Sequence, residues 1–163
     1  MFTSEIYESW MEGTQRGKIK EILEHVPPEK HVLDIGCGPG FLERFVKGVF
    51  SVDVDLENLE KSDGIKVLAD GSHLPFRGKS FKTVFCIDTI HLLDAGKITK
   101  EIQRVLSGGA AVVSTFCNEY NKSEKLFELK DRFKDCDIEK EFFAGEGEID
   151  AVIVIRNKAA AVV

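Results

Sequence analysis

The sequence predicts an α/β domain of three layers, in which helices cover both faces of a seven-stranded, mostly parallel sheet. Short apolar segments alternate with amphipathic ones along most of the chain, as they do where helical crossovers join parallel strands. The last two apolar segments instead follow one another across a short loop. They predict an antiparallel hairpin that gives the sheet one antiparallel edge strand.

Length and composition fit one domain that covers residues 1–163. Within it we expect an N-terminal cap segment with the first helix (1–30), a cofactor-binding core (31–116), and a last helix with the hairpin (117–163). No apolar run approaches the ~20 residues that span a membrane, and the N-terminus lacks an apolar signal core. We therefore expect a cytoplasmic protein without a membrane segment.

The first half of the chain predicts one helix and four strands. Ile19, Ile22, Leu23 and Val26 have helical spacing, and Pro27-Pro28 ends that helix. A short helix is expected around Phe41–Val46, and one or two helical turns at LENLEK. The predicted strands are residues 31–35, 49–53, 65–68 and 81–87.

The second half predicts two helices and three strands. Ile98, Ile102 and Val105 mark an amphipathic helix, and Gly108-Gly109 would supply its C-terminal cap and turn. A strand at 110–116 follows, and then a charged helix with an apolar side. The hairpin strands are residues 137–143 and 149–156.

The segment VLDIGCGPG, residues 32–40, carries most of the functional information. A predicted strand runs into Gly36, Gly38 and Gly40, and a helix is expected to follow. Glycines let the backbone turn sharply and approach a ligand without Cβ atoms in the way. In parallel α/β sheets, ligands bind beyond the carboxyl ends of the strands, where this loop would lie.

Three aspartates end successive predicted strands. Asp53 comes nineteen positions after Asp34, a separation that suits an acid binding two ribose hydroxyls, and Asp70 ends the third strand. Dinucleotide sites use G-x-G-x-x-G, whereas the spacing here is G-x-G-x-G. A carboxylate at Asp34 would repel a pyrophosphate and suit an ammonium group. These features favour S-adenosylmethionine over a nicotinamide cofactor.

Four segments resemble the class I S-adenosylmethionine-dependent methyltransferases, which share a Rossmann-like fold. VLDIGCGPG is similar to their first motif and SVDVDLENL to their second. VLADGSHLPFRGKSF resembles a segment of the ubiquinone-biosynthesis-like, small-molecule subgroup, and EIQRVLSGGAAVVSTF resembles the later helix, turn and strand. The resemblance implies a methyltransferase that uses S-adenosylmethionine and releases S-adenosylhomocysteine.

The resemblance also implies roles for individual residues. Gly36, Cys37, Gly38 and Gly40 would line the methionine portion of the cofactor, and Asp34 would orient the loop and meet the ammonium. Asp53 would hold the ribose, and Val54 would pack on adenine. The adenine amino group would meet Asp70, with Gly71 and Ser72 beside the ring, and Cys86 would lie next to the cofactor. Alternatively, Cys86 is a small core residue and Asp53 a surface carboxylate.

Candidates for acceptor chemistry are fewer. His91 is a candidate general base, or a packed histidine at the start of a helix. Asp88 would touch substrate or cofactor, or cap the following helix. The resemblance places Tyr7, Trp10 and Arg16 in a segment before the first helix that folds over the substrate, although the aromatic side chains could simply pack against the body.

Charge and cysteine pattern limit the partners. The net charge is −6 and the basic residues are scattered, which argues against nucleic acid. The resemblance favours a small-molecule acceptor, although a site open to a larger partner is the alternative. The four cysteines form no C-x-x-C pair, so no metal site is expected. A protein partner or a homo-oligomer stays open. Two alternative functions also stay open. The protein could be a non-catalytic or partner-dependent cofactor-binding subunit, or it could be a nicotinamide oxidoreductase.

Overall fold

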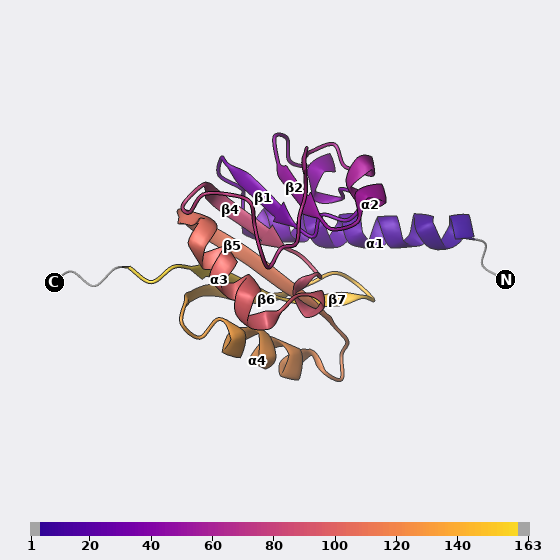
Figure 1. The fold of residues 1–163 in the computed structure, drawn as a ribbon. Coiled ribbons are helices and arrows are strands. Elements are labelled where there is room, and N and C mark those ends of the chain that lie inside the picture. Colours follow the sequence, from indigo (N-terminus) through magenta and orange to yellow (C-terminus); the bar gives the residue numbers. More distant parts are fainter. Residues whose placement is uncertain (1–3, 160–163) are drawn as a thin grey trace.

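The computed structural model describes residues 4–159, and its centre is a seven-stranded sheet with the strand order β3-β2-β1-β4-β5-β7-β6 (Figure 1). The strands are β1 (Val32–Ile35), β2 (Phe50–Asp53), β3 (Ile65–Leu68), β4 (Phe81–Cys86), β5 (Leu106–Cys117), β6 (Asp137–Ala144) and β7 (Ile149–Arg156). The helices are α1 (Ser4–His25), α2 (Leu56–Lys61), α3 (Ala95–Val105) and α4 (Lys122–Arg132), with the 3-10 turns η1 (Leu42–Arg44) and η2 (Ile90–Leu92).

Strands β1 to β5 pair in parallel, and β7 pairs antiparallel with both β5 and β6. The predicted α/β class and the hairpin are therefore confirmed. The antiparallel strand is not at the edge, however, because β7 lies between β5 and β6. Burial explains this arrangement: seven of the eight β7 residues are buried, whereas β6 is largely exposed. The backbone of a strand that is buried along its length needs hydrogen-bond partners on both edges, and β5 and β6 supply them.

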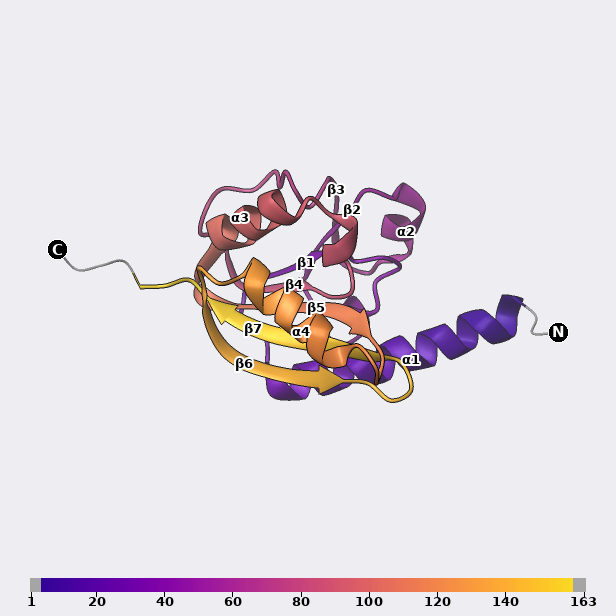
Figure 2. The same cartoon turned by 90° about the horizontal axis from the view of Figure 1, so that it is seen from below.

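Helices cover both faces of the sheet, as predicted. On one face, Ile19 and Ile22 of α1, followed by Val26, pack with Phe85 and Val112 of the central strands. On the other face, α3 and α4 pack against the sheet through Ile98, Ile102 and Leu129, together with Phe133 directly after α4. Figure 2 shows α1 and the α3–α4 pair on opposite sides. No helix in the described part of the chain is long and apolar enough to cross a membrane.

Helix α1 is longer than the sequence predicted. It begins at Ser4, so the expected helix of residues 15–26 is only its C-terminal half. Apolar residues of the N-terminal half also have helical spacing, but Ile6 and Trp10 lie on the opposite side of the helix from Ile19 and Ile22, so the two halves do not form one apolar stripe. It projects past the sheet in both views (Figures 1 and 2). Tyr7, Trp10 and Arg16 therefore lie on this helix and not before it.

Two glycine-rich segments also differ from the prediction. The helix expected after the glycine loop is a single 3-10 turn, η1, confined between Gly40 and Gly48, both of which have positive φ. Gly108-Gly109 is not a cap and turn, because α3 leads at Leu106 directly into β5. A Cβ at Gly109 would lie 1.7 Å from the Lys82 carbonyl oxygen, so this glycine permits close strand packing.

Candidate functional site

The glycine loop leaves β1 in a left-handed conformation at three positions. Gly36, Gly38 and Gly40 have φ of +73°, +54° and +89°. A Cβ at Gly36 would lie 2.2 Å from Cγ2 of Thr89, and one at Gly40 would lie 2.7 Å from Cα of Ser62. A Cβ at Gly38 would meet nothing within 4 Å. Two glycines thus permit close packing, and the middle one faces open space.

The end of β2 holds this loop in place. The amides of Gly36 and Cys37 donate to the Val52 carbonyl oxygen at 2.8 and 3.0 Å. The Gly38 amide donates to Oδ2 of Asp53 at 2.8 Å, and the Asp55 amide donates to Oδ1 at 2.9 Å. Because a carboxylate offers about four lone-pair sites, Asp53 can still accept hydrogen bonds from a bound molecule.

Two cavities flank the loop. The β2 cavity, of about 310 Å³, is lined by Asp53, Val54, Gly71, Leu92 and Leu93 among others. The α1 cavity, of about 230 Å³, is bordered by Asp34, Cys37 and Asp88, together with Met11 and Gln15 of α1. Gly36, Gly38 and Thr89 line both cavities, so the glycine loop separates two adjoining spaces.

Asp34 lies beneath the loop as one of two buried carboxyls. Burial and the nearby Glu43 and Asp53 raise the pKa of Asp34 well above its usual range. Burial also raises the pKa of Glu43, which lies near Asp34 and accepts a hydrogen bond from the Ser51 hydroxyl. Glu43 Oε2 has no hydrogen-bond partner in the described part of the chain. The Asp34–Glu43 pair therefore favours holding a proton.

Asp70 closes a local turn. Its Oδ1 accepts from the Ser72 amide at 2.8 Å, which lowers the pKa of the Asp70 carboxyl, and its Oδ2 lies 3.4 Å from Nδ1 of His73. The side chain is 49% exposed and lines neither cavity. Gly71 does line the β2 cavity, where a Cβ would lie 2.6 Å from Cγ2 of Ile35.

The segment after β4 reaches the loop through Asp88 and Thr89. Asp88 has the left-handed φ of +56° and lines the α1 cavity. Its Oδ1 accepts from the Phe116 amide at 2.9 Å, and it does not cap α3, because Asp94 does so. Sequence reasoning missed Thr89, whose hydroxyl oxygen lies 3.0 Å from the Ile87 carbonyl oxygen and 3.3 Å from the Gly36 carbonyl oxygen. Thr89 directly follows the candidate residue Asp88, and this position is the sequence feature that could have pointed to it.

His91 and Cys86 lie away from the loop. His91 is exposed and borders a separate hollow of about 60 Å³ beside α4. The 3-10 turn places Leu92 and Leu93 toward the β2 cavity and His91 away from it. Cys86 is fully buried in the core, as its alternative reading anticipated, and lines neither cavity. Burial raises the pKa of the thiols of Cys37 and Cys86, so both stay protonated.

The expected substrate residues on α1 are also dispersed. Trp10 is 52% exposed and borders a third space of about 450 Å³, the hairpin cavity, between α1 and the β6–β7 turn. Arg16 is exposed and lines none of these cavities. The side chain of Tyr7 lies outside the described part of the chain. Met11 and Gln15, spaced four residues apart before Ile19, are the α1 residues beside the loop.

This arrangement defines a Rossmann-like domain whose two cavities lie at the carboxyl ends of the strands, where ligands bind in such folds. The family described as "Methyltransferase domain" matches residues 33–114, half of the chain. The chain therefore belongs to the methyltransferase domain family, whose class I members use S-adenosylmethionine, and S-adenosylmethionine is its cofactor. The site fits this group, because open space lies beside Gly38, a carboxylate adjoins it, and apolar Val54 and Leu92 border the β2 cavity.

Several relatives carry the names of tRNA methyltransferases. The tRNA U34 carboxymethyltransferase of Nautilia profundicola is 32% identical over 56% of this chain and 36% of its own length. The Bos taurus "Probable tRNA methyltransferase 9B" is 27% identical over 77% of this chain and 29% of its own. The chain spans only 25% to 43% of the length of the curated relatives it matches.

Solved structures share the fold. One chain comes from the complex between the Haloferax volcanii Trm112 methyltransferase activator and a proposed methyltransferase. It superposes with a TM-score of 0.77 at 17% identity, covering 91% of this chain and 93% of its own. A methyltransferase from Aquifex aeolicus superposes with a TM-score of 0.71 at 16% identity, covering 87% and 92%.

Proposed function

We propose that the glycine-loop site transfers a methyl group from S-adenosylmethionine to a small-molecule acceptor. The observation that carries this proposal is the Gly38–Asp53 hydrogen bond at the boundary of two adjoining cavities. Asp53 holds the ribose hydroxyls in the β2 cavity, and Val54 and Leu92 enclose the adenine. Asp70 approaches its amino group from the rim, beside Gly71 and Ser72.

The methionine portion lies along the loop, toward the α1 cavity. Gly36, Cys37, Gly38 and Gly40 line it through their backbone, and Asp34 orients the loop from below and meets the ammonium directly or through water. Because the Asp34–Glu43 pair favours a bound proton, it supports the loop mainly through hydrogen bonding and less through a full negative charge.

Bound S-adenosylmethionine supplies a methyl group that is already electrophilic, because it is carried by a sulfonium. The protein has to hold an acceptor in line with it, and such positioning can lower a barrier by roughly 7–11 kcal/mol. Asp88 is the side chain best placed for this task, since it lines the α1 cavity and is only 23% exposed. His91 is a weaker candidate for the base, because it borders a different hollow.

The charges around the site support a small, neutral or cationic acceptor. Asp34, Asp53 and Asp88 line the two cavities beside the loop, whereas none of the residues that line these two cavities is Lys or Arg. An acidic site does not favour a phosphate backbone. A tRNA acceptor is a second candidate because relatives carry tRNA methyltransferase names. A partner-dependent subunit is a third, because one fold neighbour was solved with an activator.

Asp53→Ala tests the cofactor site. We expect S-adenosylhomocysteine, titrated by calorimetry, to bind roughly 10- to 100-fold more weakly, because the ribose loses charge-assisted hydrogen bonds. Asp55→Ala is the matched control: Asp55 caps α2 through the amides of Glu57 and Asn58, so its loss should lower stability and leave affinity unchanged. Wild-type affinity of Asp53→Ala would contradict the ribose role.

The acceptor is tested separately with S-adenosylmethionine that carries a labelled methyl group. Incubation of the chain with a small-metabolite extract should label a small molecule, and incubation with total tRNA should label nothing. Labelled tRNA would replace the small-molecule proposal with the second candidate. Labelling that appears only after a partner protein is added would favour the third.

A further inference from the structure

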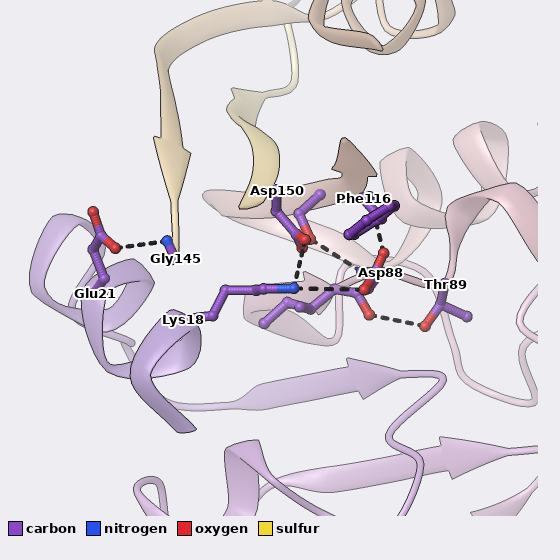
Figure 3. A network of polar contacts seen from close by, with 9 residues as sticks. Lys18, Glu21, Asp88, Thr89, Phe116, Gly145 and Asp150 are labelled. Carbon is purple, nitrogen blue, oxygen red and sulfur yellow. Dashed lines mark hydrogen bonds and ion pairs between the residues drawn. The ribbon is translucent and has the colours of Figure 1, made fainter. Parts of the chain in front are cut away.

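Polar contacts fasten helix α1 to the β6–β7 hairpin. The Gly145 amide of the β6–β7 turn donates to Oε2 of Glu21 at 2.8 Å. One turn earlier, Lys18 is fully buried, and its Nζ lies 2.6 Å from Oδ1 of Asp150 on β7 (Figure 3). Fully buried lysines are rare unless they are paired, so this ammonium has a specific role.

Lys18 also reaches the glycine-loop site. Its Nζ lies 3.7 Å from Oδ2 of Asp88, and Figure 3 shows it pointing between the two carboxylates. The Ser114 hydroxyl donates to Oδ2 of Asp150 at 2.6 Å, and the Asp88 amide donates to that hydroxyl at 3.0 Å. The contacts form a closed ring from the Asp88 amide through Ser114, Asp150 and Lys18 back to the Asp88 carboxylate.

This ring surrounds Asp88, whose backbone conformation is uncommon. Asp88 has a φ of +56°, a conformation that non-glycine residues adopt only where neighbouring contacts impose it. The ring holds its amide and its Oδ2, and the Phe116 amide holds its Oδ1. Asp88 is therefore held from three directions while its side chain borders the α1 cavity.

We propose that Lys18 is a positioning residue, which holds the Asp88 carboxylate at the wall of the α1 cavity and couples its placement to the docking of α1. The proposal rests on the proposed function of the glycine-loop site. The charge balance supports it: one ammonium faces two carboxylates, and the excess negative charge lies toward Asp88, because Asp150 is fully buried. Burial, followed by the nearby Asp88, raises the pKa of Asp150, and Lys18 opposes that shift.

A simpler role for Lys18 would be to neutralise Asp150, and a double variant separates the two roles. Lys18→Met alone leaves the buried Asp150 without its cation, and breaking such a buried pair is strongly destabilising. Lys18→Met with Asp150→Asn removes both charges of that pair and keeps the side-chain volumes. Asp150→Asn alone is the matched control, because Lys18 is still present to hold Asp88.

The Phe116 amide reports on Asp88 directly, because it donates to Oδ1 of that carboxylate. In the double variant we expect hydrogen exchange at this amide to be at least about 10-fold faster than in Asp150→Asn, as for the loss of a charge-assisted hydrogen bond. S-adenosylhomocysteine should also bind about 5- to 10-fold more weakly, because the wall of its cavity is no longer fixed.

Wild-type exchange at Phe116 in the double variant would overturn the proposal and leave Lys18 only as the partner of Asp150. The exchange measurement does not depend on cofactor binding. If the wild-type chain failed to bind S-adenosylhomocysteine, the proposed function would fail, and the Phe116 amide would still decide the role of Lys18.

Discussion

Gly36 and Gly38 are two residues apart in the loop, but the structure requires glycine at them for different reasons. Both have positive φ, which other residues adopt at a cost of about 1–2 kcal/mol. At Gly36 a Cβ would also collide with Thr89, whereas at Gly38 it would point into open space beside the two cavities. The first glycine is a packing requirement, and the second leaves room for a ligand.

Gly36→Ala and Gly38→Ala should therefore affect different properties. We expect Gly36→Ala to lower the free energy of unfolding by about 2–4 kcal/mol, because strain adds to overpacking, and Gly38→Ala by only about 1 kcal/mol. Gly38→Ala should still weaken S-adenosylhomocysteine binding by about tenfold or more, since its methyl group occupies ligand space. Urea denaturation and calorimetry measure the two effects, and equal stability losses would refute this distinction.

At the scale of elements, α1 combines two different halves. Its C-terminal half packs Ile19 and Ile22 into the core, whereas its N-terminal half borders the α1 and hairpin cavities and leaves Ile6 and Trp10 half exposed. Gly13 and Gly17 lie where the two halves meet, and a Cβ at either position would meet nothing within 4 Å. Glycine lowers the intrinsic helix propensity at these two positions, and no steric contact in the structure requires it there.

Gly13→Ala should stabilise the protein by about 0.5–1 kcal/mol, because alanine is the better helix former and no steric contact opposes it. Urea denaturation would show a higher midpoint, and amides in the first half of α1 should exchange more slowly. Gly64→Ala provides the contrast, since its Cβ would lie 1.9 Å from Oγ of Ser51 and should destabilise. A lower midpoint for Gly13→Ala would contradict the prediction.

At the scale of the whole molecule, buried carboxyls link stability to pH. Burial is the first cause of the raised pKa values of Asp34, Glu43 and Asp150. A carboxyl whose pKa is raised in the folded state keeps its proton to a higher pH than in the unfolded chain. Its contribution to stability is complete below the unfolded pKa, near 4, and is lost as the pH rises through the folded pKa.

Glu43→Gln should reduce this loss, because it removes one of the paired carboxyls and leaves an amide that can donate to Asp34. We expect the variant to match the wild type near pH 4 and to exceed it by about 1 kcal/mol or more at pH 8, one pKa unit being worth about 1.4 kcal/mol. Denaturation midpoints between pH 4 and pH 8 measure the difference. Parallel curves would mean that the Asp34–Glu43 pair does not titrate in this range.

The local pattern of the sequence was enough to predict the sheet, the glycine loop and two of its acids. Alternation of apolar segments placed the strands within a residue or two, except β5, which starts four residues earlier, because burial on a sheet face constrains each position. Asp34 and Asp53 were found because parallel strands end at the same edge. The N-terminal half of α1 was missed, since Ile6 and Trp10 lie on the opposite side of the helix from Ile19 and Ile22 and are half exposed, so they do not extend the buried stripe.

Long-range contacts could be decided only by the tertiary structure. The sequence gives no sign that Lys18 meets Asp150, which is 132 positions away, or that Thr89 rather than His91 reaches the glycine loop. Glu43 reads as a surface residue of a short helix, yet it is buried against Asp34. Local patterns specify which face of an element is buried. The partners of a buried charge depend on how all the elements pack together, because burial makes a charge costly unless a distant side chain compensates it.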